Sequence, residues 1–230
     1  YPHVRAHLSL YRGRITCKEV KNGKHPWFAL HRPRDEAIFS SPKFVGLTTS
    51  DRLIVGLDTL DLYAMDNLYL FQKADDCNET DAYLLALLNS TLLTFVYRYF
   101  AQETGRILPQ VKAANIYHLP IRRIEFATPP GERGRLVEVG TTDAAEFIAE
   151  VAAEATSALF SALSASTFGR WLDVRLSADP EQSDVVHDLL VFLAERMIEM
   201  HKEKHAEVRG FLDWMAEYTG LSIADWALKT

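Results

Sequence analysis

Two histidines on a predicted helix are the first residues whose types and spacing suit a chemical role. His201 and His205 lie one helical turn apart, which is the spacing of a zinc-binding pair. A zinc metalloprotease would place Glu directly after the first His, but Lys202 occupies that position. We therefore expect both histidines to face solvent, and we assign no metal site to the chain.

No other pattern in the sequence has the spacing of an active site. Gly131 and Gly134 lack the strand–glycine–helix context of a phosphate-binding or dinucleotide-binding turn. Glu and Lys residues within 199–204, which resemble the Glu-x-Lys cluster of metal-dependent nucleases, lie inside a predicted helix. The serines lack a nucleophile elbow, and the chain has no Asn-Pro-Pro-aromatic methylase motif. We therefore expect no catalytic residues here, which favours a binding or scaffolding module.

Basic residues near the start of the chain are the remaining candidates for chemistry. The formal net charge is −6, yet residues 1–50 carry nine Lys and Arg against three acids. Such residues in loops can contact phosphates, and Arg can also read guanine in the major groove. Alternatively, they form a solvated face or pair with Glu19, Asp35 and Glu36. The candidate DNA-binding residues from this charge pattern are Arg12, Arg14, Lys18, Lys21, Lys24, His31, Arg32, Arg34 and Lys43.

Composition limits the class of protein. The chain has 230 residues, of which 48% are hydrophobic and 24% charged, as in globular proteins. No apolar run approaches the roughly 20 residues of a membrane span, and residues 1–5 lack the apolar core of a signal peptide. Cys17 and Cys77 have no metal-type or disulfide-type spacing, which indicates a reducing compartment. We expect a cytoplasmic C-terminal part of a longer protein, with no membrane partner.

The elements expected to position the basic residues form a small sheet. The Asn22–Gly23 pair predicts a hairpin within residues 1–30. Apolar residues at helical spacing predict one helix from 83 to 100. Three short runs rich in β-branched or aromatic residues are predicted strands, at residues 43–47, 53–57 and 67–71.

The second half of the chain is predicted to be helical. A stretch rich in Pro and Gly, 128–135, predicts a linker. Asp143 and Glu146 match a capping box at the start of a helix over 143–163. A longer helix is predicted over 185–218. Its apolar residues recur at three- and four-residue steps and predict a buried seam: Val186, Leu190, Leu193, Met197, Met200, Val208, Phe211 and Met215.

These elements predict an α+β (mixed α/β) fold, in which a small β-sheet domain with packed helices precedes a helical C-terminal region. We expect a recognition domain over residues 1–124, a linker over 125–142, and a helical spacer or docking region over 143–230. The charge differs between the halves, because residues 125–230 carry nine Lys and Arg against 19 acids. An anionic partner is therefore expected at the first half alone.

Several sequence blocks in the first half occur in a characteristic order. The most specific is Tyr83–Ser90, which continues through Phe95 and Tyr97. The other blocks are Trp27–Leu30, Phe39–Val45, Gly105–Arg106 with Lys112, and Leu119–Ile121. In this order the blocks resemble the TaqI-like C-terminal specificity domain, which follows adenine methylase domains in type IIG restriction–modification enzymes. That domain is similar to the target recognition domains of type I specificity subunits.

The resemblance implies that the chain is the sequence-specific DNA recognition module of a restriction–modification adenine methyltransferase. An upstream domain of the same polypeptide would transfer a methyl group from S-adenosylmethionine to adenine, and this module would bind double-stranded DNA. No cofactor is then held in this chain, and Lys112 joins the candidate DNA-binding residues. Two alternatives stay open. In one, helices 143–163 and 185–218 dock a partner subunit; in the other, the chain is a nuclease with an unrecognised site.

Overall fold

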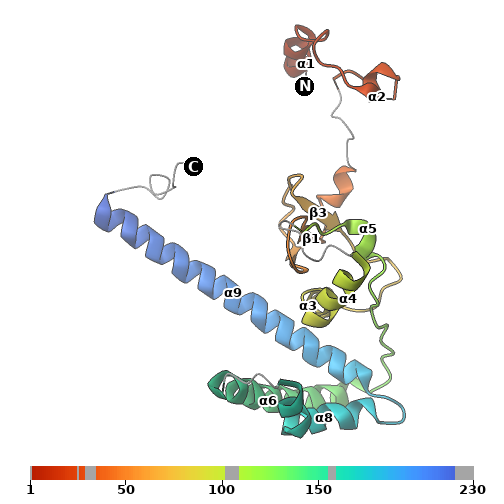
Figure 1. The fold of residues 1–230 in the computed structure, drawn as a ribbon, viewed down its shortest axis with the longest axis vertical. Coiled ribbons are helices and arrows are strands. Elements are labelled where there is room, and N and C mark those ends of the chain that lie inside the picture. Colours follow the sequence, from red (N-terminus) through yellow and green to blue (C-terminus); the bar gives the residue numbers. More distant parts are fainter. Residues whose placement is uncertain (1, 25, 29–34, 102–108, 155–158, 221–230) are drawn as a thin grey trace.

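The first half of the protein is built around a small antiparallel sheet (Figure 1). Its strands are β1 (Lys43–Leu47), β2 (Val55–Asp58) and β3 (Leu68–Phe71), and their order β2-β1-β3 places β1 in the centre. The predicted strands and the α+β class are therefore confirmed, with slightly shifted strand boundaries. The computed structural model describes residues 2–24, 26–28, 35–101, 109–154 and 159–220.

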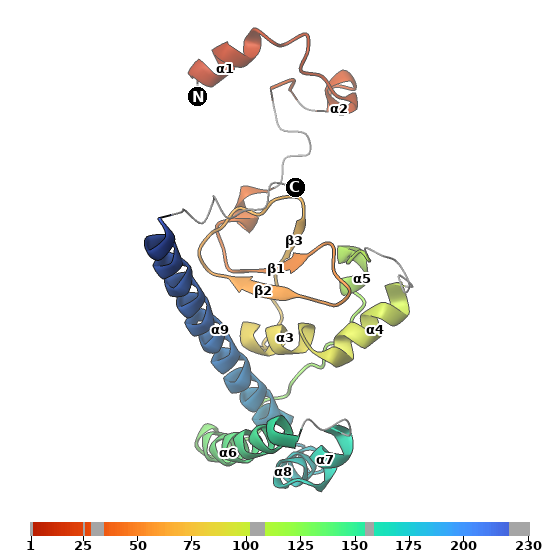
Figure 2. The same cartoon turned by 60° about the vertical axis from the view of Figure 1, so that its left-hand side comes forward.

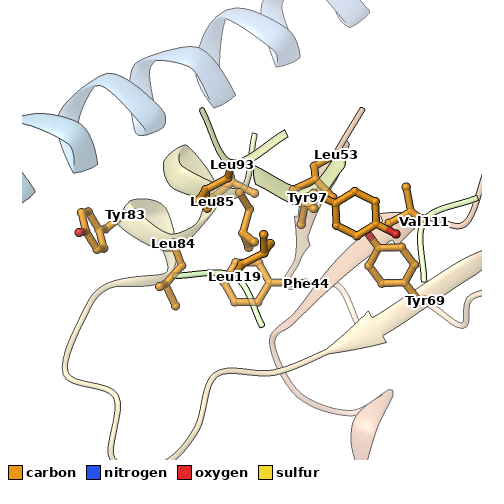
Figure 3. Packing of buried hydrophobic residues seen from close by; sticks show 12 residues of the cluster. Phe44, Leu53, Tyr69, Tyr83, Leu84, Leu85, Leu93, Tyr97, Val111 and Leu119 are labelled. Carbon is orange, nitrogen blue, oxygen red and sulfur yellow. The ribbon is translucent and has the colours of Figure 1, made fainter. Parts of the chain in front are cut away.

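Two helices pack beside this sheet, α3 (Asp81–Leu88) and α4 (Thr91–Ala101). They are bent by 62° relative to each other, so the prediction of one continuous helix is wrong. Figure 3 shows apolar side chains gathered between these helices and the sheet. The buried residues of this core include Phe44, Leu53, Val55, Tyr69, Leu85, Leu88, Leu93, Tyr97, Val111 and Leu119. Within the described part of the chain, no single helix is long and apolar enough to cross a membrane.

Asn89 accounts for the break between α3 and α4. Its side-chain amide donates to the Leu85 carbonyl (2.9 Å), and Asn89 itself is the C-cap of α3. The same side chain accepts from the Val55 N–H (3.0 Å) and donates to the Val55 carbonyl (2.9 Å). Those two backbone groups lie on the outer edge of β2, which has no described strand beyond it. One side chain therefore ends a helix and satisfies part of an open sheet edge.

The second half is helical, with α6 (Pro130–Glu154), α7 (Leu159–Ala165), α8 (Thr167–Leu176) and α9 (Ser183–Thr219). Helix α6 begins within the stretch predicted to be a linker, and the expected capping box at Asp143 lies in its interior. Helix α6 can begin at Pro130 because proline is tolerated in the first helical turn, where an N–H has no intrahelical partner. The remaining short helices are α1 (Pro2–Ser9), α2 (Lys18–Lys21), η1 (Glu36–Ile38) and α5 (Ala113–Ile116).

Helix α9 confirms the predicted long helix but only part of its buried seam. Its first half packs against α3, α6 and α8, and buries Val185 and Leu189 with Trp171 of α8. Leu190 and Leu193 are only half-buried, while Met197, Met200, Val208 and Phe211 are exposed. The seam prediction is therefore wrong from Met197 to Phe211, and Met215 is only half-buried.

The start of α9 connects the two halves of the chain. His187 is buried, accepts from the Thr80 N–H at the start of α3 through Nε2 (3.4 Å), and packs on the Tyr83 ring (4.6 Å between centroids). Asp184 accepts from the Thr128 N–H (2.7 Å) and from its hydroxyl (2.8 Å). Because both side chains are buried, His187 holds α9 against the sheet-containing part and Asp184 holds α9 against the segment that leads into α6.

Candidate nucleic-acid interface

The N-terminal residues form helices and not the predicted hairpin. Helices α1 and α2 lie apart from the sheet in two views that differ by 60° (Figures 1 and 2). Asn22 is the C-cap of α2, and Gly23 follows with φ +69°. A glycine in the left-handed region commonly ends a helix. The Asn-Gly pair therefore ends α2 here and does not form the turn of a hairpin.

Residues 12–24 form the strongest concentration of unneutralised positive charge, and we call them the basic segment. Its cations are all exposed: Arg12, Arg14, Lys18, Lys21 and Lys24. Among the described residues, the last four have no ion-pair partner. One acid, Glu19, lies among them. Charges exposed in this way are available to an anionic polymer, because no carboxylate has to be displaced.

Two cation–π contacts organise this part of the chain. The Arg12 guanidinium lies 5.6 Å from the Trp27 ring centre, and that of Arg5 lies 5.0 Å from the Phe28 ring centre. Arg12, Lys21 and Trp27 line an open hollow of about 620 Å³. The aromatic side chains therefore hold one end of the basic segment without neutralising its charge.

Lys43 is placed differently from the other candidates, because its side chain is inside the protein. Its Nζ lies 2.6 Å from Asp58 Oδ2, and the side chains are 0% and 6% exposed. The hydrogen bond from Lys43 lowers the pKa of Asp58, although burial acts in the opposite direction. Asp58 also accepts from the N–H groups of Leu60 and Leu62. A phosphate cannot reach this ammonium group in the folded protein, so we remove Lys43 from the candidate DNA-binding residues.

A comparison with known families gives the first half of the chain an identity. Residues 9–121 match the family model described as the TaqI-like C-terminal specificity domain. This segment is a TaqI-like specificity domain. The match includes the basic segment, the sheet and helices α3, α4 and α5. It confirms the resemblance seen in the sequence, and it makes this part of the chain a specificity module of a restriction–modification enzyme. No curated protein sequence matches the chain.

The other predicted DNA-binding residues of the specificity domain fall in two places. Lys112 is exposed and directly precedes α5, and its backbone N–H donates to the Tyr97 hydroxyl (2.8 Å). Helix α5 lies beside the sheet, away from α1 and α2 in both views. The structure therefore does not bring Lys112 next to the basic segment. His31, Arg32 and Arg34 lie outside the described residues.

Most exposed cations of the sheet-containing part are paired with carboxylates. The ion pairs are Lys73–Asp81 (3.3 Å), Arg98–Asp51 (3.7 Å), Arg122–Glu181 (2.6 Å) and Arg123–Glu79 (3.2 Å). Arg52, in the loop between β1 and β2, is exposed and has no ion pair among the described residues. The charge pattern of residues 1–50 did not include it, although its place between two predicted strands could have indicated a recognition loop.

Glu79 anchors the end of the specificity domain. Its side chain is 1% exposed and accepts from the Cys77 thiol (3.1 Å), the Ile124 N–H (2.8 Å) and Arg123 (3.2 Å). Burial acts to raise the pKa of Glu79, but these hydrogen bonds and the Arg123 charge lower it to about 2. The carboxylate therefore ties the segment leaving the domain to the residues before α3.

The histidine pair of α9 faces solvent, as expected from the sequence. His201 and His205 are both exposed and line one side of a groove between α9, α3 and β2. In the part of the chain that the structure describes, no three His, Cys, Asp or Glu side chains are grouped so that they could hold a metal ion.

Proposed function

We propose that this chain selects the DNA sequence for a restriction–modification adenine methyltransferase of type IIG. The observation that carries the proposal is the family match over residues 9–121. The linked catalytic domain, in the same polypeptide, would bind S-adenosylmethionine and transfer its methyl group to adenine in the cytoplasm. The family match also favours DNA recognition over a module that only docks a partner subunit.

The basic segment is our proposed contact with the DNA backbone. Its exposed cations would displace counterions condensed on the phosphates, which supplies affinity independent of sequence. The acidic second half, with nine Lys and Arg against 19 acids, would repel the same phosphates. DNA is therefore expected to approach from the side of α1 and α2.

Salt-dependent binding tests this contact. In Arg14→Ala/Lys18→Ala, two exposed cations that have no ion pair among the described residues are lost, so the slope of log affinity against log salt should become shallower by about two. Arg135→Ala/Arg170→Ala is the matched control, because it removes the same charge from exposed positions of α6 and α8. Fluorescence anisotropy with a duplex at several salt concentrations measures both variants. Equal slopes for both variants would show that the basic segment does not contact DNA.

The finer part of the proposal concerns adenine methylation. The isolated chain, incubated with DNA and labelled S-adenosylmethionine, should transfer no label. The full-length protein should label adenine at one sequence. Label on cytosine would contradict the adenine assignment and leave the recognition role intact.

A further inference from the structure

The loop between β1 and β2 is joined to the segment that precedes α5. Thr49 and Gln110 form an antiparallel bridge between the two. Beside this bridge, the Val111 N–H donates to the Thr48 carbonyl (2.8 Å). The loop lies next to α5 at the end of the sheet (Figure 2). Two segments that are more than 50 residues apart in the sequence therefore form one short piece of paired backbone.

Helix α4 braces both segments of this paired backbone. The Tyr97 side chain is buried, and its hydroxyl donates to the Gln110 carbonyl (3.3 Å) and accepts from the Lys112 N–H (2.8 Å). The neighbouring Arg98 donates through Nε to the Asp51 carbonyl (2.8 Å), and its guanidinium lies 3.7 Å from the Asp51 carboxylate. One turn of α4 therefore fixes the backbone on both sides and pairs the acid of the loop with a cation.

Four polar side chains of the paired backbone are exposed, and we call them the polar ridge: Thr49, Arg52, Gln110 and Lys112. Gln110 and Lys112 flank Val111, which is only 5% exposed, so their side chains lie on the outward face of the segment. Hydrogen bonds lie on either side of the Thr49–Gln110 pair and not within it. In such a pair the two Cα atoms are about 4.5 Å apart, so the side chains are close neighbours.

We infer that the polar ridge reads base edges in the major groove of the DNA, an inference that rests on the proposed function. The side-chain types are those that base edges recognise. The Arg52 guanidinium matches O6 and N7 of guanine, the Gln110 amide matches N6 and N7 of adenine, and the Thr49 hydroxyl can bond to either base. The two cations of the ridge favour the approach of DNA, because Asp51 beside them is already paired with Arg98.

The bracing by α4 is what base reading requires. Hydrogen bonds to a base are directional, so a side chain that discriminates between bases must start from a fixed backbone. Tyr97 holds the backbone at Gln110 and Lys112, and Arg98 holds it next to Arg52. The ridge and the basic segment then have different tasks, because phosphate contacts position a protein on DNA and base contacts specify the sequence.

Sequencing of bound duplexes tests the inference. The 230-residue chain is mixed with duplexes that have a randomised centre, and the bound fraction is isolated on a native gel and sequenced. The wild type should enrich one motif. Gln110→Ala should weaken the preference for adenine at one position about tenfold, the order of magnitude for one lost base contact. Asn78→Ala is the matched control, because it removes an exposed neutral amide of the same domain outside the ridge, and it should keep the motif.

Arg52→Gln tests the second reading residue by a change of preference. Glutamine at this position should favour adenine where the wild type favours guanine, and the rest of the motif should stay the same. Lys18→Ala in the basic segment should have the opposite effect. It should make the salt dependence of binding shallower and leave the whole motif unchanged, because a phosphate contact carries no sequence information.

The outcomes separate this inference from the proposed function. A wild-type motif that survives unchanged in both Gln110→Ala and Arg52→Gln would overturn the inference, even if both variants bind all duplexes more weakly, and would leave the proposed function intact. A wild type that enriches no motif would overturn both. Circular dichroism confirms that each variant is folded, which is expected because both side chains are exposed.

Discussion

Replacing Asp58 by Asn tests whether the buried ion pair with Lys43 supports the fold. The change removes the carboxylate charge that lies 2.6 Å from the Lys43 ammonium, at a site where the two side chains are 0% and 6% exposed. Loss of one partner from a buried pair typically costs about 3–5 kcal/mol, because the other charge stays buried without a counterion. Lys43 keeps one hydrogen bond, to the Phe39 carbonyl (3.0 Å), and the introduced amide can still accept. We therefore expect the lower end of the range, about 3 kcal/mol.

The double variant Lys43→Met/Asp58→Asn separates the charge from the packing. It removes the buried ammonium together with its partner, so its cost should be smaller than the sum of the two single changes by about 1 kcal/mol or more. Urea unfolding followed by tryptophan fluorescence at neutral pH measures all three variants. Lys202→Ala is the control for an ion pair in solvent, since Lys202 and Glu199 are 68% and 53% exposed, and it should cost less than about 1 kcal/mol.

A cost below about 1 kcal/mol for Asp58→Asn would refute this reasoning. It would show that water reaches the pair in solution. Lys43 would then return to the candidate phosphate ligands, and Lys43→Met should make the salt dependence of DNA binding shallower. With the pair buried, Lys43→Met lowers stability and leaves that salt dependence unchanged.

Three further changes test other parts of the structure. Glu79, whose pKa is lowered from 4.5 to about 2, should contribute stability above pH 4.5 that is lost as pH falls towards 2; Glu79→Gln should flatten this decline in urea unfolding between about pH 5 and 3. Asn89→Ala leaves the edge groups of Val55 without partners and should cost about 1–3 kcal/mol in the same assay. Gly46→Val places a side chain where the Tyr69 ring lies, so the melting temperature should fall by several degrees.

The strands could be predicted because each depends on a short local pattern. Residues 43–47 include the aromatic Phe44 and the β-branched Val45, and the structure has β1 over the same range. The long helix, Ser183–Thr219, could be predicted for the same reason, since apolar residues recur at three- and four-residue steps from Val186 to Met200 and again from Val208 to Met215. Local patterns of this kind need no knowledge of the rest of the fold.

Other features depend on contacts between distant residues, and the sequence alone did not reveal them. The break at Asn89 requires β2, which lies 34 residues earlier, to present an unpaired edge. The burial of Lys43 requires Asp58 on the neighbouring strand. A lysine in a basic stretch otherwise resembles its exposed neighbours, so only the strand register distinguishes it.

The half-exposed seam of α9 shows a limit of periodicity as evidence. Apolar spacing at three- and four-residue steps indicates that one side of a helix is covered by something. It does not indicate whether the cover is another part of the chain or another molecule. Met200 and Phe211 fit the spacing as well as Leu193 does, yet they are exposed in the single chain.

Helix α9 also sets a constraint on how the sequence can change. Its 37 residues form one uninterrupted rod of about 55 Å, held at its start by Asp184 and His187. Each residue inserted after His187 advances the far end by about 1.5 Å and rotates it by about 100°. A single inserted residue would therefore turn Trp214 to a different side of the molecule. Seven inserted residues would nearly restore its direction, about two helical turns further along the axis. Insertions or deletions of seven residues should therefore be tolerated in this helix better than those of a single residue.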